Sequence, residues 1–305
     1  MGEAPAPRAA GGRRHRCGYV AIVGRPNVGK STLLNRLIGQ KLSITSHRAQ
    51  TTRHRILGVL SREDAQLLIL DTPGVQASAQ SAMNRLLNRT ARQVAEDADV
   101  VVMVCDATGW TAADESLARA LPGDRPVLLA VNKVDRVAEK ARLLPMIERA
   151  SRAREFAEIV PISARNGHQV QRLADLCAER LPEGEALFEA DALTDRSERF
   201  LAAEVIREKL FRLLGDELPY ASTVEIERYE ESPRLRRIHA AILVERDAHK
   251  GIVLGAGGAR IKRIASEARV DLERMTGTRV YLEVFVKVRS GWADTEQSLR
   301  AYGYE

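Results

Sequence analysis

The sequence predicts two folded parts: an α/β domain with a mainly parallel sheet and helices on both faces, and then a smaller α+β domain. Two observations carry this prediction. In the first half, apolar runs typical of buried strands alternate with helical segments, and each run ends in a glycine-rich or polar motif. In the second half, a helix precedes two strands of alternating polarity, two helices and a last strand. The 305 residues, of which 45% are hydrophobic, suffice for two cores.

The first motif follows the apolar run at 19–23 and precedes the apolar-periodic segment at 32–38. A buried strand, a glycine-bounded loop and a helix start are the context of a phosphate-binding P-loop. Backbone N–H groups of such a loop converge on one anionic site. We expect Lys30 to reach the β- and γ-phosphates of a nucleotide and the Ser31 hydroxyl to hold Mg²⁺. The predicted loop consists of Gly24, Arg25, Pro26, Asn27, Val28, Gly29, Lys30, Ser31 and Thr32.

The second motif follows the apolar run at 67–70 and consists of Asp71, Thr72, Pro73 and Gly74. An acid at a strand end can join the Mg²⁺ shell, and the Gly74 N–H can approach the γ-phosphate. We therefore assign Asp71 to the metal site together with Ser31.

Two further motifs predict that the base is guanine. The run at 127–131 ends in Asn132, Lys133, Val134 and Asp135. A carboxylate at Asp135 can accept both N–H donors of a guanine edge, a pair that adenine cannot supply. We expect the Lys133 stem to lie against the base and Asn132 to brace the loop. The run at 159–162 ends in Ser163 and Ala164, whose N–H groups can meet the guanine oxygen.

These four motifs resemble those of the translation-factor-related GTPases, and further segments resemble the Era family, bacterial GTPases of small-ribosomal-subunit assembly. The segments lie at 43–46, 50–55, 194–197, 207–210, 217–220, 224–227 and 290–294, so the resemblance covers both halves. It implies an α/β P-loop GTPase domain followed by an α+β type II KH domain. The expected parts are a disordered basic extension (1–16), a GTP-binding domain (17–181), a linker (182–195), a KH RNA-binding domain (196–289) and a tail helix (290–305).

Switch I of such a GTPase needs a hydroxyl that closes onto Mg²⁺ and the γ-phosphate. Thr51 and Thr52 both offer one, and the resemblance favours Thr52 because related GTPases place this threonine directly before an arginine. Ras-like GTPases have a water-orienting glutamine after the glycine of the second motif. Val75 occupies this position and has no polar atom, so we expect slow intrinsic hydrolysis.

A catalytic set of Lys30, Thr52, Gly74 and Asn27 is expected, with Ser31, Thr52 and Asp71 at the metal. The resemblance implies that Asn27 helps to bind K⁺. The alternative is that this asparagine serves only the backbone geometry of the turn.

The second half has the element order α-β-β-α-α-β with a GxxG loop, which is typical of KH domains that bind single-stranded RNA. We expect a helix over about 196–214, with Phe200, Leu201, Val205, Ile206, Leu210 and Leu213 on one face, and strands at 223–228, 238–245 and 279–288. The GxxG glycines let backbone N–H groups approach a sugar-phosphate chain. The predicted RNA-binding residues are Lys250, Ile252, Gly255, Ala256, Gly257, Gly258, Arg260, Ile261 and Lys262.

One departure concerns the loop itself. Many KH loops carry a basic residue inside GxxG, whereas Ala256 and Gly257 are neutral. Between residues 248 and 266 the chain has four Lys and Arg residues and no acid, so we expect Lys250, Arg260 and Lys262 to contact phosphates instead.

The resemblance implies a partner and a place in the cell. In its GTP state the protein would bind the single-stranded 3′ end of small-subunit (16S) ribosomal RNA during assembly of the 30S subunit, and link assembly to cell growth. We expect a cytoplasmic monomer with peripheral contact at the inner face of the cell membrane. The net charge of +6 and a pI near 9.4 agree with an RNA partner without establishing one.

Two rival classes remain open. One is a membrane-associated signalling GTPase whose KH-like half binds protein. The other is a GTPase of tRNA modification, which would need a modification domain and a catalytic cysteine tail that the sequence does not show. Three scattered cysteines offer neither a disulfide framework nor metal-ligand spacing. We expect Asp97, Asp99, Asp114 and Glu115 to be solvated helix ends rather than a second metal site, and Trp292, Tyr302 and Tyr304 to pack the tail helix.

Overall fold

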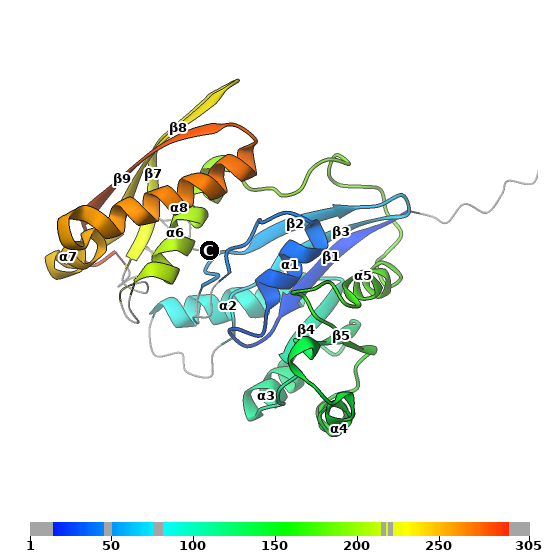
Figure 1. The fold of residues 1–305 in the computed structure, drawn as a ribbon. Helices are drawn as coiled ribbons and strands as arrows, with labels where there is room; N and C mark the ends of the chain where they lie inside the picture. Colours follow the sequence, from blue (N-terminus) through cyan, green and yellow to red (C-terminus); the bar gives the residue numbers. More distant parts are fainter. Residues whose placement is uncertain (1–14, 46–50, 76–81, 215–217, 219–221, 293–305) are drawn as a thin grey trace, which may run out of the picture.

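The computed structural model describes residues 15–45, 51–75, 82–214, 218 and 222–292, and its ribbon shows two groups of elements around two separate sheets (Figure 1). The described strands form one sheet of six and one of three. Of the extension expected at 1–16, residues 1–14 lie outside the described residues, and Arg16 already begins a strand (Arg16–Val23). Of the tail expected at 290–305, residues 293–305, with Tyr302 and Tyr304, lie outside the described residues, and Trp292 packs against Met83, Leu86 and Leu87.

The larger sheet has the strand order β2-β3-β1-β4-β5-β6. Its strands are β1 (Arg16–Val23), β2 (Ile56–Ser61), β3 (Ala65–Asp71), β4 (Val100–Asp106), β5 (Val127–Asn132) and β6 (Glu158–Pro161). Only the pairing of β2 with β3 is antiparallel. The mainly parallel sheet is therefore confirmed, and the carboxyl ends of β1, β3, β4, β5 and β6 share one edge. Ligands of open parallel sheets bind at this edge.

Helices cover both faces of the larger sheet and bury two apolar cores. The helices α1 (Lys30–Ile38) and α5 (Val170–Ala178) pack on one face. On the other face lie α2 (Ala82–Asp97), α3 (Ala112–Ala120) and α4 (Leu143–Ala153), with the short 3₁₀ turns η1 (Val134–Arg136) and η2 (Lys140–Arg142) before α4. Strand residues pointing to opposite faces supply the two cores alternately, as the period of two requires.

The segment between α5 and the second domain contains no helix or strand, but it is tied to the first domain. The buried side chain of Gln66 on β3 accepts hydrogen bonds from the backbone N–H groups of Leu187 and Phe188 at 2.8 and 3.0 Å. Its amide nitrogen donates to the Phe188 carbonyl at 2.9 Å. One glutamine thus fixes the path of the chain between the two domains.

The second domain has the predicted order of elements. It consists of α6 (Glu198–Leu213), β7 (Ser222–Ser232), β8 (Leu235–Val244), α7 (Asp247–Leu254), the turn η4 (Ala256–Gly258), α8 (Ala259–Thr276) and β9 (Arg279–Val288). In this sheet β8 pairs with β7 antiparallel and with β9 parallel. The three helices contribute to one core with the sheet. The predicted α+β fold is confirmed.

Helix α6 differs from the amphipathic helix that the sequence predicts. Leu201, Val205, Ile206 and Leu210 are buried as expected, whereas Phe200 and Leu213 are only half-buried. Four polar residues are buried as well, namely Glu204, Arg207, Glu208 and Lys209. The reason is that α6 packs on its own sheet with one side and against residues of the first domain with another.

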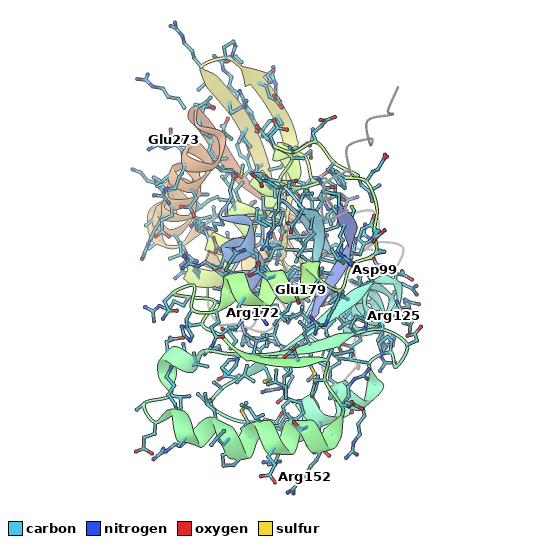
Figure 2. The ribbon with its side chains drawn as sticks, turned by 90° about the vertical axis from the view of Figure 1, so that its right-hand side faces the viewer. Asp99, Arg125, Arg152, Arg172, Glu179 and Glu273 are labelled. Atoms are coloured by element: carbon cyan, nitrogen blue, oxygen red, sulfur yellow. The ribbon has the colours of Figure 1, made fainter. Side chains whose placement is uncertain are left out.

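Charged side chains project outward around the molecule, and Arg152 on α4 and Glu273 on α8 lie near opposite ends of it in Figure 2. Among the helices that the structure describes, none is long and apolar enough to cross a membrane. The described residues also contain no group of three or more His, Cys, Asp or Glu side chains able to hold a metal ion.

Candidate functional site

The P-loop joins β1 to α1 through a glycine that no other residue can replace without displacing its neighbours. Gly29 has a φ of +103°, and a Cβ at this position would lie 2.3 Å from Nδ2 of Asn132. Helix α1 begins at Lys30, directly after this glycine, and has no side-chain cap. The first N–H groups of the helix are therefore available to an anion.

The Lys30 ammonium is held at the mouth of this loop. Its Nζ donates to the carbonyls of Gly24 and Arg25 at 3.1 and 3.0 Å. Burial lowers the pKa of Lys30 to about 8, although the nearby charge of Asp71 works in the opposite direction. A phosphate group beside Lys30 would supply the missing countercharge.

Three side chains with oxygen atoms that can act as metal ligands meet next to Lys30. Ser31 Oγ donates to Asp71 Oδ2 at 2.7 Å and lies 2.8 Å from Thr52 Oγ1. Ser43, which the motifs do not mark, also donates to Asp71 Oδ2 at 2.7 Å. The other carboxylate oxygen of Asp71 is buried without a hydrogen-bond partner among the described residues, and burial raises the pKa of this acid. Such a set of two hydroxyls and a carboxylate fits a hard divalent cation such as Mg²⁺.

The base-side motif is braced against the P-loop. Asn132 donates from Nδ2 to the Val28 carbonyl at 2.7 Å and accepts from the Ala164 N–H at 2.9 Å. The bracing role predicted for Asn132 thus agrees with its contacts. Asp135 is oriented by Ser163, whose Oγ donates to it at 2.6 Å.

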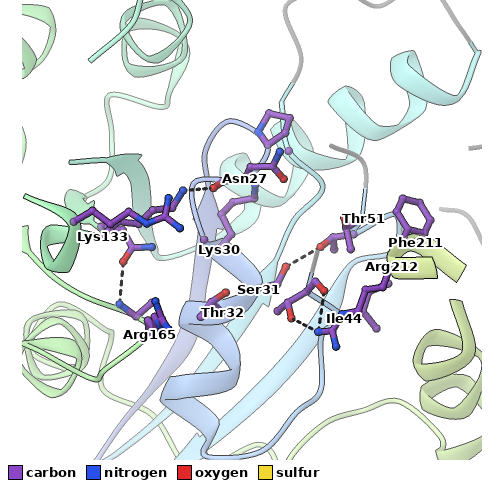
Figure 3. A pocket seen from close by; sticks show the side chains of 18 of the residues that line it. Asn27, Lys30, Ser31, Thr32, Ile44, Thr51, Lys133, Arg165, Phe211 and Arg212 are labelled. Carbon is purple, nitrogen blue, oxygen red and sulfur yellow. Dashed lines mark hydrogen bonds between the residues drawn. The ribbon is translucent and has the colours of Figure 1, made fainter. Parts of the chain in front are cut away.

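Most of these groups surround one cavity of about 840 Å³, which is large enough for a nucleoside triphosphate. Asp71 and Ser163 do not line it but are hydrogen-bonded to Ser31 and Asp135, which do. In Figure 3, Lys133 and Arg165 lie at one side of it, Thr51, Phe211 and Arg212 at the other, and Lys30 and Ser31 between them. Of the predicted nucleotide residues, those that line it are Pro26, Asn27, Gly29, Lys30, Ser31, Thr32, Thr52, Gly74, Asn132, Lys133, Asp135 and Ala164.

The other predicted nucleotide residues do not line the cavity. The side chains of Val28 and Val134 belong to the apolar cores, and Thr72 Oγ1 donates to the Ile22 carbonyl at 2.8 Å.

Gly74 lies against Pro26, where a Cβ would come within 2.7 Å of the Pro26 nitrogen. The second motif and the P-loop are therefore in direct contact.

One expectation about acidic side chains is wrong. Asp114 is not solvated but fully buried: it accepts from Arg25 Nε at 2.7 Å and completes a capping box with Thr111 at the start of α3. Because Arg25 belongs to the P-loop, this ion pair anchors the loop to α3. Asp99 also accepts a backbone hydrogen bond, from the N–H of Tyr19 at 2.8 Å.

Several residues of the cavity were not predicted from the motifs. Arg136 and Arg165 directly follow two of the motifs, so their positions in the chain could have indicated them. Asp106, which ends β4, does not line the cavity but pairs with Lys133, which does. The position of β4 beside β5 in the sheet explains its place. Phe211 and Arg212 come from α6 of the second domain, and no feature of the sequence points to their presence in this cavity.

The predicted RNA-binding residues lie together around η4, between α7 and α8. Gly255 has a φ of +69°, and a Cβ there would lie 2.8 Å from the Cβ of Arg260. The Ile252 side chain is 45% exposed, and Lys250, Ala256, Gly257 and Lys262 are also exposed. One guanidinium nitrogen of Arg260 donates to the Ile252 carbonyl, so this side chain spans the loop. An apolar side chain beside glycines and lysines is suited to a base and its phosphate.

The comparisons with known proteins cover both halves. A family model described as a 50S ribosome-binding GTPase matches residues 19–133, and a KH domain model matches residues 217–293. GTPase Era of Bordetella avium (strain 197N) is 52% identical over 290 residues, which are 95% of this chain and 98% of that protein. GTPase Era of Pseudomonas aeruginosa (strain LESB58) is 53% identical over 290 residues, or 95% of each chain.

Two solved structures have the same overall fold. Era in complex with MgGDPNP and nucleotides 1506–1542 of 16S ribosomal RNA superposes with a TM-score of 0.91 at 40% identity, over 95% of this chain and 99% of that one. An Era variant of Aquifex aeolicus bound to GDP and AlF₄⁻ gives a TM-score of 0.91 at 41% identity over the same shares. With this identity across both domains, and with the nucleotide motifs gathered in one cavity, the chain belongs to the Era family of GTPases.

Proposed function

We propose that this GTPase, in its GTP state, binds the single-stranded 3′ end of small-subunit ribosomal RNA through its KH domain and acts in small-subunit assembly in the cytoplasm, linking assembly to cell growth. The observation that carries the proposal is the exposed GxxG turn at 255–258 beside Ile252 and Lys250. The solved Era complex with 16S ribosomal RNA nucleotides supports it, since that protein aligns over both domains.

In the nucleotide site, Lys30 and the N–H groups at the start of α1 bind the β- and γ-phosphates, and the Gly74 N–H faces the γ-phosphate. Asp135 selects guanine, and Lys133 lies against the base. The N–H groups of Ala164 and Ser163, which we expected at the guanine oxygen, instead donate to Asn132 Oδ1 at 2.9 Å and to the His168 carbonyl at 3.1 Å. Ser31, Thr52 and Asp71 hold Mg²⁺, which neutralises charge on the phosphates. The distance of 2.8 Å between the hydroxyls of Ser31 and Thr52 supports Thr52 rather than Thr51 in this role.

Hydrolysis proceeds slowly without a partner. The Val75 side chain packs against the apolar core and its N–H donates to the Gly24 carbonyl at 3.2 Å, so neither is free to orient water. Asn27 lines the cavity and would help to hold K⁺, which would supply positive charge beside the phosphates. Its φ of +64°, in the left-handed region, also serves the backbone geometry of the turn. The protein works as a monomer with peripheral contact at the membrane.

A binding assay with a labelled oligonucleotide that copies the 3′ end of small-subunit ribosomal RNA tests the proposal. Gly257 has a φ of +56°, a backbone strain that Asp tolerates better than most residues, and a Cβ there meets nothing within 4 Å. Gly257→Asp should therefore fold at a modest cost in stability and lose RNA binding by charge repulsion. Gly123→Asp, which adds the same carboxylate in open space on an exposed loop of the first domain, is the matched control. If parent and Gly257→Asp bind the oligonucleotide equally, the KH loop is not the RNA site. If neither binds while association with vesicles persists, the protein-binding signalling GTPase becomes the better account.

A further inference from the structure

Helix α6 belongs to the KH domain, yet it forms part of the wall of the nucleotide cavity. Phe211 and Arg212 line this cavity together with Thr45 and Thr51, which come before and after residues 46–50 in switch I. Figure 3 shows Phe211 and Arg212 on the same side of the cavity as Thr51. The neighbouring polar residues of α6 are buried, with Glu204, Arg207, Glu208 and Lys209 each at most 3% exposed. Buried charges are tolerated only when they are paired, so their partners indicate what this part of α6 does.

The first attachment is at the entry to switch I. The Glu208 carboxylate is fully buried, and its Oε1 accepts from the N–H of Thr45 at 3.1 Å and from Thr45 Oγ1 at 3.3 Å. The same oxygen accepts from Arg212 at 2.8 Å, and the other pairs with the ammonium of Lys41. A single carboxylate of the KH domain therefore holds the segment that leads from α1 into switch I.

The second attachment is at the exit from switch I. The Arg207 guanidinium donates to the Thr51 carbonyl at 2.6 Å and is held by two hydrogen bonds to Glu204, at 2.7 and 2.6 Å. Arg53, two residues further on, donates to the Ser222 carbonyl of β7 at 3.1 Å. Between these anchors stands Thr52, whose hydroxyl faces Ser31.

We propose that Arg207 and Glu208 are positioning residues of the nucleotide site: they hold both flanks of switch I so that Thr52 stays at the metal position. The inference deepens the proposed function, since it rests on the role given to Thr52 there. Docking of α6 then favours the triphosphate over the diphosphate, and by linkage the triphosphate favours docking of α6 by the same factor. RNA plays no part in this argument, so a failure of RNA binding would leave it intact.

Substitutions of Arg207 separate positioning from packing. Arg207→Met keeps the aliphatic stem and removes the donor to the Thr51 carbonyl, whereas Arg207→Lys retains a charge and a donor. Glu204→Gln combined with Arg207→Met avoids an unpaired buried carboxylate and guards against misfolding. The control is Glu198→Gln on the first turn of α6, where the carboxylate accepts from Tyr229 at 2.6 Å within the KH domain.

Two measurements on the full-length protein test whether Arg207 positions switch I. The first is the ratio of the dissociation constants for GDP and a non-hydrolysable GTP analogue in Mg²⁺. The second is hydrogen exchange at the amides of 43–45 and 51–53 in nucleotide-free protein. We expect Arg207→Met and the double variant to weaken analogue binding about five- to tenfold, the lower range of allosteric coupling, with GDP binding within about twofold. Exchange should rise at both flanks, and Arg207→Lys should recover part of both effects.

The control variant should match the parent in both readouts. An unchanged ratio and unchanged exchange in a double variant that unfolds at the parent temperature would overturn the proposal. Equal weakening of GDP and analogue would overturn it too, because general damage to the cavity would then explain the loss.

Discussion

Nζ of Lys133 lies 2.6 Å from Oδ2 of Asp106 and donates to the Asn27 carbonyl at 2.6 Å, so one lysine joins the guanine motif to the P-loop. Burial alone would raise the pKa of Asp106, but Lys133 and Thr108 outweigh it and lower this pKa below its ordinary value. The acid is therefore charged at neutral pH and fixes the lysine over the cavity.

Replacing Asp106 by Asn should weaken GTP and GDP to a similar degree. Lys133 would lose its charged partner while the P-loop carbonyl remains, and we expect a loss of about three- to tenfold, roughly 1 kcal/mol. Titration with fluorescent GTP and GDP analogues measures it. Asp124→Asn, which removes an exposed pair with Arg125, serves as the control. Unchanged affinity for both nucleotides would show that Asp106 does not position Lys133.

Asp135→Asn should change which base the cavity accepts. An amide offers one acceptor and one donor in place of two acceptors, so it suits a base with a carbonyl at the position of the guanine amino group. GTP affinity should fall by at least about a hundredfold, since buried polar groups of a mismatched base stay unpaired. Competition between GTP and xanthosine triphosphate gives the result. A variant that still prefers GTP would mean that Asp135 does not contact the guanine edge.

Asp114→Asn tests the anchor between the P-loop and α3. The amide still caps α3 but pairs poorly with Arg25, and a charged hydrogen bond of this kind contributes about 1.5–3 kcal/mol. We expect the free energy of unfolding in urea to fall by about that amount, and nucleotide affinity to fall with it. Glu115→Gln, on the same helix turn and paired on the surface with Arg119, should change stability little. Equal stability of both variants would contradict the buried pair.

The pH dependence of stability should report the contact between the two domains at Asp271. Burial alone would raise its pKa, but the ammonium groups of Lys209 and Lys41 outweigh burial and lower the pKa to about 2. A carboxyl with a depressed native pKa contributes stability that is complete above its unfolded pKa of about 4 and is lost as the pH falls through about 2. Parent and Asp271→Asn should therefore differ in stability at pH 5, and the difference should shrink steadily as the pH falls from 4 through 2. A difference that is as large at pH 2 as at pH 5 would show that the ion pairs do not cause it.

Much of the fold and of the nucleotide site was predictable because the decisive residues are adjacent in the chain. The P-loop needs a glycine at residue 29 and a lysine at residue 30, and both follow directly from a strand. The other motifs also end strands, and the parallel arrangement brings those ends to one edge. The α-β-β-α-α-β order was equally predictable, because each element carries its own periodicity.

The contributions of tertiary contacts could not be predicted in the same way. The burial of Asp114 depends on α3 packing beside the P-loop, and its charge alone suggested a solvated helix end. Glu208 and Arg207 are charged residues of the kind that usually lies on the exposed face of a helix. Only the packing of α6 on switch I turns them into buried partners of Thr45 and Thr51, and no local pattern encodes that contact.

The central claim is that the nucleotide controls RNA binding. Its most direct test is the affinity of the parent protein for an oligonucleotide copying the 3′ end of small-subunit ribosomal RNA, measured with a non-hydrolysable GTP analogue and with GDP at one fixed salt concentration. The account predicts binding at least about tenfold tighter with the analogue, within the usual range of allosteric coupling. Equal affinity in the two nucleotide states would contradict it.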